Sequence, residues 1–244
     1  MTRFKIVVPS YNSFPWIERT LRSIESQIHD NFDVVVVDDA STDPQHSQVI
    51  KEFCDRNNWI YVAREQNGGP LAGLIDGIAA HTCTDEDVIV VVDGDDWLAN
   101  EWVLQKVDNA YSSSDALFTY GQYLNYRAGT IGHCGPPKPK TIRKLRYREK
   151  SWLFSHLRTF KYLLWRQIRD QDLRDPRTGD YFRTAGDLAT MFPMAEMAGP
   201  RFRFIPEVLY IYNDANPISD FRVRLAEQQA ADKLIRSLPR YSSI

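Results

Sequence analysis

The sequence is poor in the features that would place it in an oxidising compartment or in a membrane. Its three cysteines, Cys54, Cys83 and Cys134, lie far apart and form no CxxC pair. This argues against a disulfide framework or a cysteine-based zinc site, and it fits a reducing compartment. No apolar run approaches the ~18 residues of a membrane span. The chain enters a predicted strand directly after its first three residues, so we expect no signal peptide and predict a cytoplasmic location.

An excess of charge of one sign is also lacking. Among 244 residues, 30 Lys and Arg face 32 Asp and Glu, and the net charge is −2. This balance provides no general attraction to nucleic acid or to an anionic membrane. The hydrophobic fraction of 43% and the charged fraction of 25% are ordinary for a globular protein. The length fits one large domain, or one domain with an appended subdomain.

The first 120 residues alternate between predicted strands and helices. Apolar runs typical of buried parallel strands occupy residues 4–8, 33–37, 59–63, 88–92 and 117–120. Between them, apolar residues recur at spacings of three and four, as on one face of a helix; Ile17, Leu21, Ile24 and Ile28 are the first such set. This alternation predicts an α/β fold with a mostly parallel sheet and helices on both faces.

The pattern changes after Gly121. Residues 129–139 are rich in Gly and Pro and predict a loop. Apolar residues at helical spacing predict an amphipathic helix within 152–169. The remaining predictions are a helix over 187–197, a strand over 202–212 and a final helix that begins at a Ser219 cap and runs to about 238.

The most informative segment is an apolar run that ends in three carboxylates. Residues 88–92 predict a buried strand, and Asp93, Asp95 and Asp96 follow it. Open α/β sheets bind ligands at the carboxyl ends of their strands. The Asp-x-Asp pair needs a compensating charge, which a hard divalent cation that also binds phosphate oxygens would supply. A loop with capping acids is the alternative.

Three more predicted strands end in polar turns, which a parallel sheet would bring to the same edge. The four turns are Pro9–Asn12, Asp38–Ser41, Asn67–Gly69 and Asp93–Asp96. Together they predict a nucleotide pocket, in which Tyr11 stacks on a base and Asp39 accepts a hydrogen bond from an imide N–H. Gly68 and Gly69 let the backbone approach phosphate. Each turn taken alone has an ordinary explanation as a cap or a turn.

These blocks resemble a known family. In chain order they are Val7–Asn12, Val35–Asp43, Asn67–Gly69 with Gly77-Ile78, and Val92–Leu98, all within about 40% of the chain. Their sequences and spacing are similar to those of family 2 glycosyltransferases of the GT-A fold. The resemblance implies a nucleotide-sugar donor, usually a UDP-sugar, a Mn²⁺ or Mg²⁺ cofactor, and inversion at the anomeric carbon.

The resemblance also implies which residues act. Residues 1–120 would hold the donor, and residues 121–244 would supply the acceptor side and the catalytic base of the same GT-A domain. Two departures stand out: many relatives carry an Arg-Asn pair where this chain has Leu74-Ile75, and relatives often carry Arg or His near residues 210–219, where Asn213 or Asn216 is left as a substitute. The implied donor-binding residues are Pro9, Tyr11, Asn12, Asp39, Asn67, Gly69, Asp93 and Gly94, and the implied metal ligands are Asp93 and Asp95.

An inverting transfer needs a carboxylate that takes the proton from the acceptor hydroxyl. The family usually places it as the Asp of a Glu-Asp pair at the start of a helix, and Asp187 occupies that position here, with Gly186 instead of the Glu. We therefore predict Asp187 as the general base. Helix N-capping is the other role that an Asp here would fill well. Asp180 and Glu196 are the reserve candidates.

A basic stretch in the second half bears on the acceptor. Residues 138–150 carry seven Lys and Arg, opposed only by Glu149. Three interpretations stay open: a solvated loop followed by a core helix, an acceptor-side lid, or peripheral membrane docking with Trp152, Phe154 and Trp165. The predicted acceptor is a glycan or another anionic hydroxyl compound, such as a lipid-linked diphosphate. Nucleic acid is supported by no recognition motif.

Three other classes of protein compete with a glycosyltransferase. A strand ending in Asp93-Gly94-Asp95 with a distant Gly186-Asp187 resembles haloacid dehalogenase-like phosphohydrolases, but that motif normally closes the first strand, and it leaves the three upstream turns unexplained. A sugar-nucleotide pyrophosphorylase would carry a Gly-rich loop with Arg and Lys after the first strand. A non-catalytic binding module would not need both metal-binding acids and a candidate base.

Overall fold

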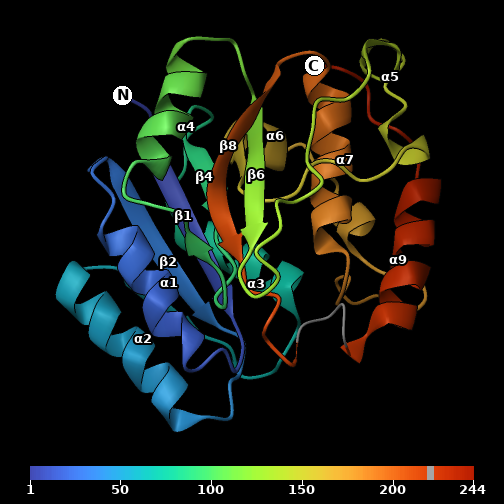
Figure 1. Ribbon diagram of the computed structural model, residues 1–244. Coiled ribbons are helices and arrows are strands. Elements are labelled where there is room, and N and C mark those ends of the chain that lie inside the picture. Colours follow the sequence, from blue (N-terminus) through green and yellow to red (C-terminus); the bar gives the residue numbers. More distant parts are fainter. Residues whose placement is uncertain (219–222) are drawn as a thin grey trace.

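Strands and helices alternate through the first half of the chain, as predicted, in the computed structural model of the protein (Figure 1). The structure describes residues 1–218 and 223–244. The strands are β1 (Phe4–Ser10), β2 (Phe32–Asp38), β3 (Ile60–Ala63), β4 (Val88–Val91), β5 (Trp97–Leu98), β6 (Phe118–Asn125), β7 (Arg158–Lys161) and β8 (Phe202–Tyr212). The α-helices are α1 (Trp16–Glu25), α2 (Pro44–Asn57), α3 (Pro70–Ala80), α4 (Val103–Ser112), α5 (Pro139–Arg143), α6 (Tyr162–Trp165), α7 (Gly186–Ala198) and α9 (Leu225–Ser237), and two 3₁₀ turns are η1 (Tyr147–Glu149) and η2 (Asp170–Leu173).

The described strands join in one mixed sheet, in the order β3-β2-β1-β4-β7-β6-β8-β5. The first four are parallel, β7 is antiparallel to both of its neighbours, and β6 and β8 run parallel to each other. Strand order reverses at β1, because β2 lies on one side of it and β4 on the other. Such a reversal opens a crevice at the carboxyl ends of the strands, which positions a ligand site there.

The register brings the predicted polar turns together. Ser10 of β1 lies beside Asp38 of β2, and Val7 lies beside Val91 of β4. The chain therefore leaves β1, β2 and β4 at the same edge of the sheet, and the turns that follow these strands start side by side. This is the arrangement that the four polar turns predicted.

Two apolar cores cover the two faces of the sheet. On one face, α1, α2 and α4 pack on β1, β2 and β4, with Ile17, Leu21 and Ile24 of α1 fully buried as their spacing predicted. The fourth residue of that predicted set, Ile28, is exposed because α1 ends at Glu25. On the other face, α3, α6 and α7 pack on the sheet, and α9 contributes Ala231 and Ile235 from the outer side of α7 (Figure 1). The apolar runs Val34–Val37 in β2 and Val88–Val91 in β4 are buried because both faces are covered.

The prediction of one helix across residues 152–169 is wrong. Residues 158–161 form β7, which lies between β4 and β6 near the middle of the sheet, and only residues 162–165 are helical. The apolar spacing of three and four was misleading because β7 and α6 bury side chains in both cores: Leu157 faces one core, and Phe160 and Leu164 face the other. Pairing with two neighbouring strands outweighs helix periodicity in so short a segment.

The other expectations for the second half hold closely. Helix α7 and strand β8 occupy the predicted positions. The last helix begins at Leu225 and ends at Ser237, and the predicted cap at Ser219 lies outside the described residues. Within residues 1–218 and 223–244, no helix has the length and apolarity that crossing a bilayer requires.

The basic stretch 138–150 attaches to the far end of α7. Tyr147 donates a hydrogen bond to the carbonyl of Gly199, and the buried Arg148 pairs with Glu196 at 2.7 Å. Helix α7 begins 13 residues earlier, at Gly186, so about 20 Å of helix separates its first residue from Gly199. Arg148 is therefore a core residue, whereas Lys138, Lys140, Arg143 and Lys144 are exposed.

The aromatic residues proposed for membrane docking take part in the core. Phe154 is buried, Trp152 packs edge-on against Phe154 and Phe192, and Trp165 stacks on Phe160. Peripheral membrane binding needs apolar side chains on the surface. The exposed charges of the basic stretch are therefore not accompanied by these three aromatic side chains at the surface.

Candidate functional site

One cleft is lined by the predicted donor-binding residues, metal ligands and general base. It lies at the carboxyl ends of β1, β2 and β4 and has a volume of about 510 Å³. This is within the range of small-molecule sites. The predicted residues that line it are Pro9, Tyr11, Asn12, Asp39, Asn67, Gly69, Asp93, Gly94, Asp95 and Asp187. The reserve bases do not line it: Asp180 is exposed, and Glu196 is buried against Arg148.

Asp39 is held rigidly at one end of the cleft. Its Oδ1 accepts hydrogen bonds from Arg64 Nη1 at 2.5 Å and from the backbone N–H of Gly68 at 2.9 Å. Its Oδ2 accepts from the N–H of Gly69 at 2.8 Å. Because the carboxylate takes two consecutive amide groups of the Asn67–Gly69 turn, it joins the end of β2 to the start of α3. The side chain is only 4% exposed and still borders the cleft.

The neighbouring Asp38 has a structural role. Its carboxylate accepts hydrogen bonds from the N–H of Ser41, the hydroxyl of Ser47 and the hydroxyl of Tyr61. These contacts close the turn after β2. Hydrogen bonding of this kind lowers the pKa of Asp38 despite the burial that would raise it.

Tyr11 and Asn12 form the outer wall at this end. Tyr11 is 40% exposed, so its ring is available to a ligand. Asn12 has a positive φ of 46° and accepts a hydrogen bond from the N–H of Thr42, while its own N–H donates to the Ser41 hydroxyl. The turns after β1 and β2 are therefore tied to each other.

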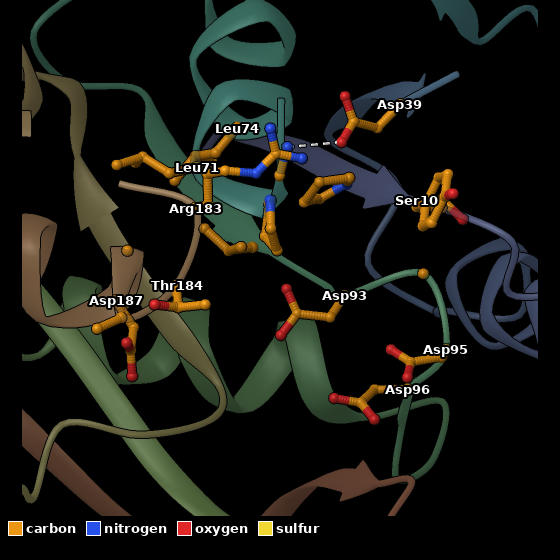
Figure 2. A pocket seen from close by; sticks show the side chains of 18 of the residues that line it. Ser10, Asp39, Leu71, Leu74, Asp93, Asp95, Asp96, Arg183, Thr184 and Asp187 are labelled. Atoms are coloured by element: carbon orange, nitrogen blue, oxygen red, sulfur yellow. Dashed lines mark hydrogen bonds between the residues drawn. The ribbon is translucent and has the colours of Figure 1, made fainter. Parts of the chain in front are cut away.

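The acidic cluster occupies the opposite end of the cleft (Figure 2). Asp93 and Asp95 line it, and Asp96 is only 1% exposed. Asn216 Nδ2 donates to Asp95 Oδ2 at 2.6 Å, and the N–H of Asn213 donates to Asp96 Oδ1 at 2.7 Å. The two Asn that were predicted as substitutes thus bind the acidic cluster from the loop after β8.

The donor set around Asp93 suits a divalent cation. One oxygen of Asp93, one of Asp96 and a ring nitrogen of His156 lie within 4.8 Å of one another. His156 Nδ1 is buried without a hydrogen-bond partner among the described residues, 3.8 Å from Asp93 Oδ2. Burial, and after it the nearby Asp95 and Asp93, raise the pKa of Asp96 well above its usual value, as expected for a carboxyl group enclosed next to other acids.

Arg158 of β7 lies between two of the predicted carboxylates. Its Nη2 is 3.2 Å from Asp93 Oδ2, and its Nη1 is 3.8 Å from Asp187 Oδ2. Burial raises the pKa of Asp187, and the guanidinium opposes that shift. Burial and Arg158 both lower the pKa of His156 well below its usual value, so the imidazole is neutral. A carboxylate with a raised pKa, close to a cation, has the character of a general base.

Gly186 explains why the family's Glu is missing before Asp187. A Cβ built on Gly186 would lie 2.9 Å from Cβ of Leu71, because the first turn of α7 packs directly on α3. Real Cβ atoms essentially never approach so closely. Only glycine fits here, and the close packing places Asp187 beside the donor half of the cleft.

The sequence analysis missed several residues that line the cleft, among them His156, Arg158 and Arg183. Arg158 is the first residue of β7 and His156 lies two residues before that strand, in a segment that was predicted as helix, so neither was considered for the site. Arg183 was overlooked because it precedes the Asp187 motif without forming part of it. Strand β7 reads Arg-Thr-Phe-Lys, so its sequence carries no pattern that would have singled out Arg158.

Comparison with known proteins agrees with this geometry. Residues 5–168, more than half of the chain, match the sequence model of glycosyl transferase family 2. EpsJ of Bacillus subtilis, an uncharacterised glycosyltransferase, is 25% identical over 219 residues, which cover 88% of this chain and 61% of EpsJ. The glycosyltransferase GlyA of Streptococcus pneumoniae is 30% identical over 101 residues, which cover 41% of this chain and 14% of GlyA. The matched segments thus span less than two thirds of these relatives.

Two solved structures share the fold. Residues 1–349 of TarS from Staphylococcus aureus, in complex with UDP-GlcNAc, align with a TM-score of 0.62 at 23% identity, covering 87% of this chain and 59% of that one. A mannosyltransferase of Pyrobaculum calidifontis, in complex with GDP-Man and Mn²⁺, aligns with a TM-score of 0.64 at 20% identity, covering 98% and 66%. The predicted GT-A architecture is confirmed, and with the family match it follows that the chain belongs to glycosyl transferase family 2.

Proposed function

We propose that this glycosyltransferase is inverting and moves a sugar from a nucleotide sugar, most simply a UDP-sugar, to a hydroxyl acceptor. The observation that carries the proposal is the convergence of the ten predicted donor-binding, metal-binding and base residues on one cleft, with a fixed carboxylate at one end and an acidic cluster at the other. Two solved structures of the same fold hold nucleotide sugars, UDP-GlcNAc in one and GDP-Man in the other.

In this proposal the nucleoside lies at the Asp39 end. Tyr11 and Pro9 pack against the base, and the Asn67–Gly69 turn lets the backbone come close to the donor. The diphosphate then points toward Asp93 and Asp95. A Mn²⁺ or Mg²⁺ ion bound by Asp93 and Asp95, with Asp96 and His156 within reach of Asp93, would neutralise the charge of the departing diphosphate.

Asp187 takes the proton from the acceptor hydroxyl. The oxygen attacks the anomeric carbon from the face opposite to the leaving diphosphate, so the configuration inverts. Arg158 holds the carboxylate in place and keeps it from becoming too weak an acid to ionise. The bond between the anomeric carbon and the diphosphate oxygen breaks as the new glycosidic bond forms.

The acceptor is proposed to be a glycan or another anionic hydroxyl compound. Among the described residues that line the cleft, none belongs to the basic stretch 138–150, so that stretch does not place the reacting hydroxyl. A short acceptor in the cleft cannot also reach the basic stretch 138–150, whereas a long anionic acceptor can. TarS is named a poly(ribitol-phosphate) β-N-acetylglucosaminyltransferase, and it is 36% identical over 104 residues that cover 41% of this chain and 18% of TarS.

The donor assignment is tested by thermal shift with a panel of nucleotide sugars in the presence of Mn²⁺. A ligand that binds only the folded state raises Tm by mass action. At a concentration 100 times Kd it adds ~2.7 kcal/mol to the free energy of unfolding. We expect UDP-sugars to raise Tm and to release UDP on turnover. A protein that releases phosphate from phosphoesters, and whose Tm no nucleotide sugar changes, would support the phosphohydrolase alternative.

A further inference from the structure

A hydrogen bond between side chains joins the acceptor half of the chain to the donor half at the cleft. Arg183, in the segment that precedes α7, donates from Nη2 to Oδ1 of Asn67 at 2.5 Å. The backbones also meet here, since a Cβ on Gly69 would lie 3.1 Å from the Arg183 carbonyl oxygen. Gly69 has a positive φ of 88°, so glycine is required there for its conformation as well.

The contact places the Arg183 guanidinium beside Asp39. Asn67 donates from Nδ2 to the backbone carbonyl of Asp39, so one amide side chain bridges Arg183 and the Asp39 backbone. Figure 2 shows the guanidinium on the Asp39 side of the cleft, with Asp93, Asp95 and Asp96 across from it. Arg183 therefore faces the nucleoside end and not the acidic end.

Asp39 has one accepting position left for a ligand. A carboxylate offers about four lone-pair sites. Arg64 and Gly68 occupy the two on Oδ1, and Gly69 occupies one on Oδ2, counting donors among residues 1–218 and 223–244. The remaining site on Oδ2 suits an N–H of the base. A guanidinium with an unused N–H group next to it suits a carbonyl oxygen on the same edge of the base.

The wall between these groups is apolar. Leu71 and Leu74 of α3 line the cleft at 2% and 7% exposure, next to the Arg183 side chain in Figure 2. At position 74 of α3, where many relatives carry an Arg, the Leu side chain offers no hydrogen-bond donor to the base. The guanidinium comes instead from the acceptor half of the chain, four residues before Asp187.

We propose that Arg183 is a specificity residue for the donor nucleobase and donates a hydrogen bond to a base carbonyl next to the N–H that Asp39 accepts. This rests on the proposed function, and for a UDP-sugar the edge is the imide of uracil. Asn67 orients the guanidinium, because its Oδ1 accepts a hydrogen bond from Nη2 of Arg183. Because Arg183 and Asp187 share one short segment, binding of the nucleoside also fixes the segment that carries the predicted base.

The test compares uridine with UDP, because only the latter has phosphates. Their affinities are measured by calorimetry with Mn²⁺ for the wild type, Arg183→Leu and Arg183→Lys. Arg22→Leu is the matched control, since Arg22 lies on α1, is 62% exposed, forms a salt bridge with Glu18 and does not line the cleft. Thermal unfolding of each variant checks that the fold is kept.

We expect Arg183→Leu to weaken the affinities for uridine and for UDP by the same factor, roughly 10- to 100-fold, as for the loss of a hydrogen bond from a charged donor. KM for the UDP-sugar should rise more than kcat falls. Arg183→Lys should restore little, because a single ammonium cannot bond Asn67 and the base at once. Arg22→Leu should bind as the wild type does.

Two results would overturn the proposal while leaving the proposed function intact. One is an Arg183→Leu variant that binds uridine as the wild type does but binds UDP more weakly, which would make Arg183 a phosphate contact. The other is unchanged affinity for both ligands. A wild type that binds neither uridine nor UDP would instead contradict the donor assignment itself, and this inference would fall with it.

Discussion

Arg158, in the middle of the sheet, lies close to Asp187 at the start of α7: the guanidinium Nη1 is 3.8 Å from the carboxylate Oδ2, and both side chains border the cleft. The same guanidinium also contacts Asp93. A buried cation between two acids lets both remain ionised at close quarters. In the proposed reaction these acids serve different partners, Asp93 the donor and Asp187 the acceptor.

Removal of Arg158 should shift the pH dependence of turnover. Because the guanidinium lowers the pKa of Asp187 against the effect of burial, Arg158→Met should raise that pKa further. A base must be unprotonated, so the acidic limb of the kcat profile should move to higher pH. Arg158→Lys keeps a charge and should move the limb less. A pH–kcat profile of each variant decides this, and an unmoved limb in Arg158→Met would mean that the two groups do not interact in the active enzyme.

Asp187→Asn should reduce kcat by ~10²-fold or more, the scale of general base catalysis, with donor affinity little changed. Its stability should not suffer. Burial raises the pKa of Asp187, so ionisation at neutral pH favours the unfolded state, and an uncharged Asn removes this cost. Steady-state kinetics and UDP titration measure the two effects. If nucleotide-sugar affinity fell in step with kcat, Asp187 would be a donor contact or a structural cap.

Arg148→Met should unfold the protein more easily without acting on the chemistry. Glu196 is fully buried, and its two oxygens bind Nε and Nη2 of Arg148. Leaving that carboxylate unpaired should cost about 3–5 kcal/mol. The double variant Arg148→Met with Glu196→Leu should recover much of the loss, as measured by urea unfolding. Equal stability of the single variant and the wild type would contradict this role for the pair.

The exposed part of the basic stretch should matter only for long acceptors. Neutralising Lys140, Arg143 and Lys144 together leaves the core residue Arg148 intact. With an anionic polymer as acceptor, KM should rise and its salt dependence should flatten, whereas hydrolysis of the donor should not change. A short acceptor with the same terminal unit is the control and should show no effect. An unchanged KM for the polymer at low salt would leave the stretch as a solvated surface.

The donor half was predictable because local pattern and tertiary structure agree there. The apolar runs of β1, β2 and β4 are buried on both faces, whereas β3, also predicted as a buried strand, lies at the edge of the sheet and is partly exposed. Each run is followed by a polar turn, and parallel pairing brings the turns to one edge whatever the details of packing. The sequence favoured Asp39 over Asp38 through the polar turns and the resemblance, without a structural reason for the choice. The structure supplies a physical reason for it, since Asp38 bonds to its own turn, and only Asp39 borders the cleft.

The second half was less predictable because its chemistry depends on contacts distant in sequence. Arg158 and His156 reach the cleft only through the insertion of β7 between β4 and β6, and helical spacing concealed that strand. Arg183 meets Asn67 across 116 positions of the chain. Likewise, Arg148 looked like one charge of a basic stretch until its partner 48 positions later was known.

The central claim is that the cleft binds a nucleotide-sugar donor through a cation on Asp93 and Asp95, and calorimetric titration with UDP tests it most directly. The wild type should bind UDP in the presence of Mn²⁺, and excess chelator should weaken that binding by tenfold or more, the effect of ~1.4 kcal/mol. Asp95→Asn should weaken binding by a similar factor in Mn²⁺ and should unfold like the wild type, because Asp95 lies in a turn at the cleft. UDP affinity that is the same with Mn²⁺, with chelator and in Asp95→Asn would contradict the account.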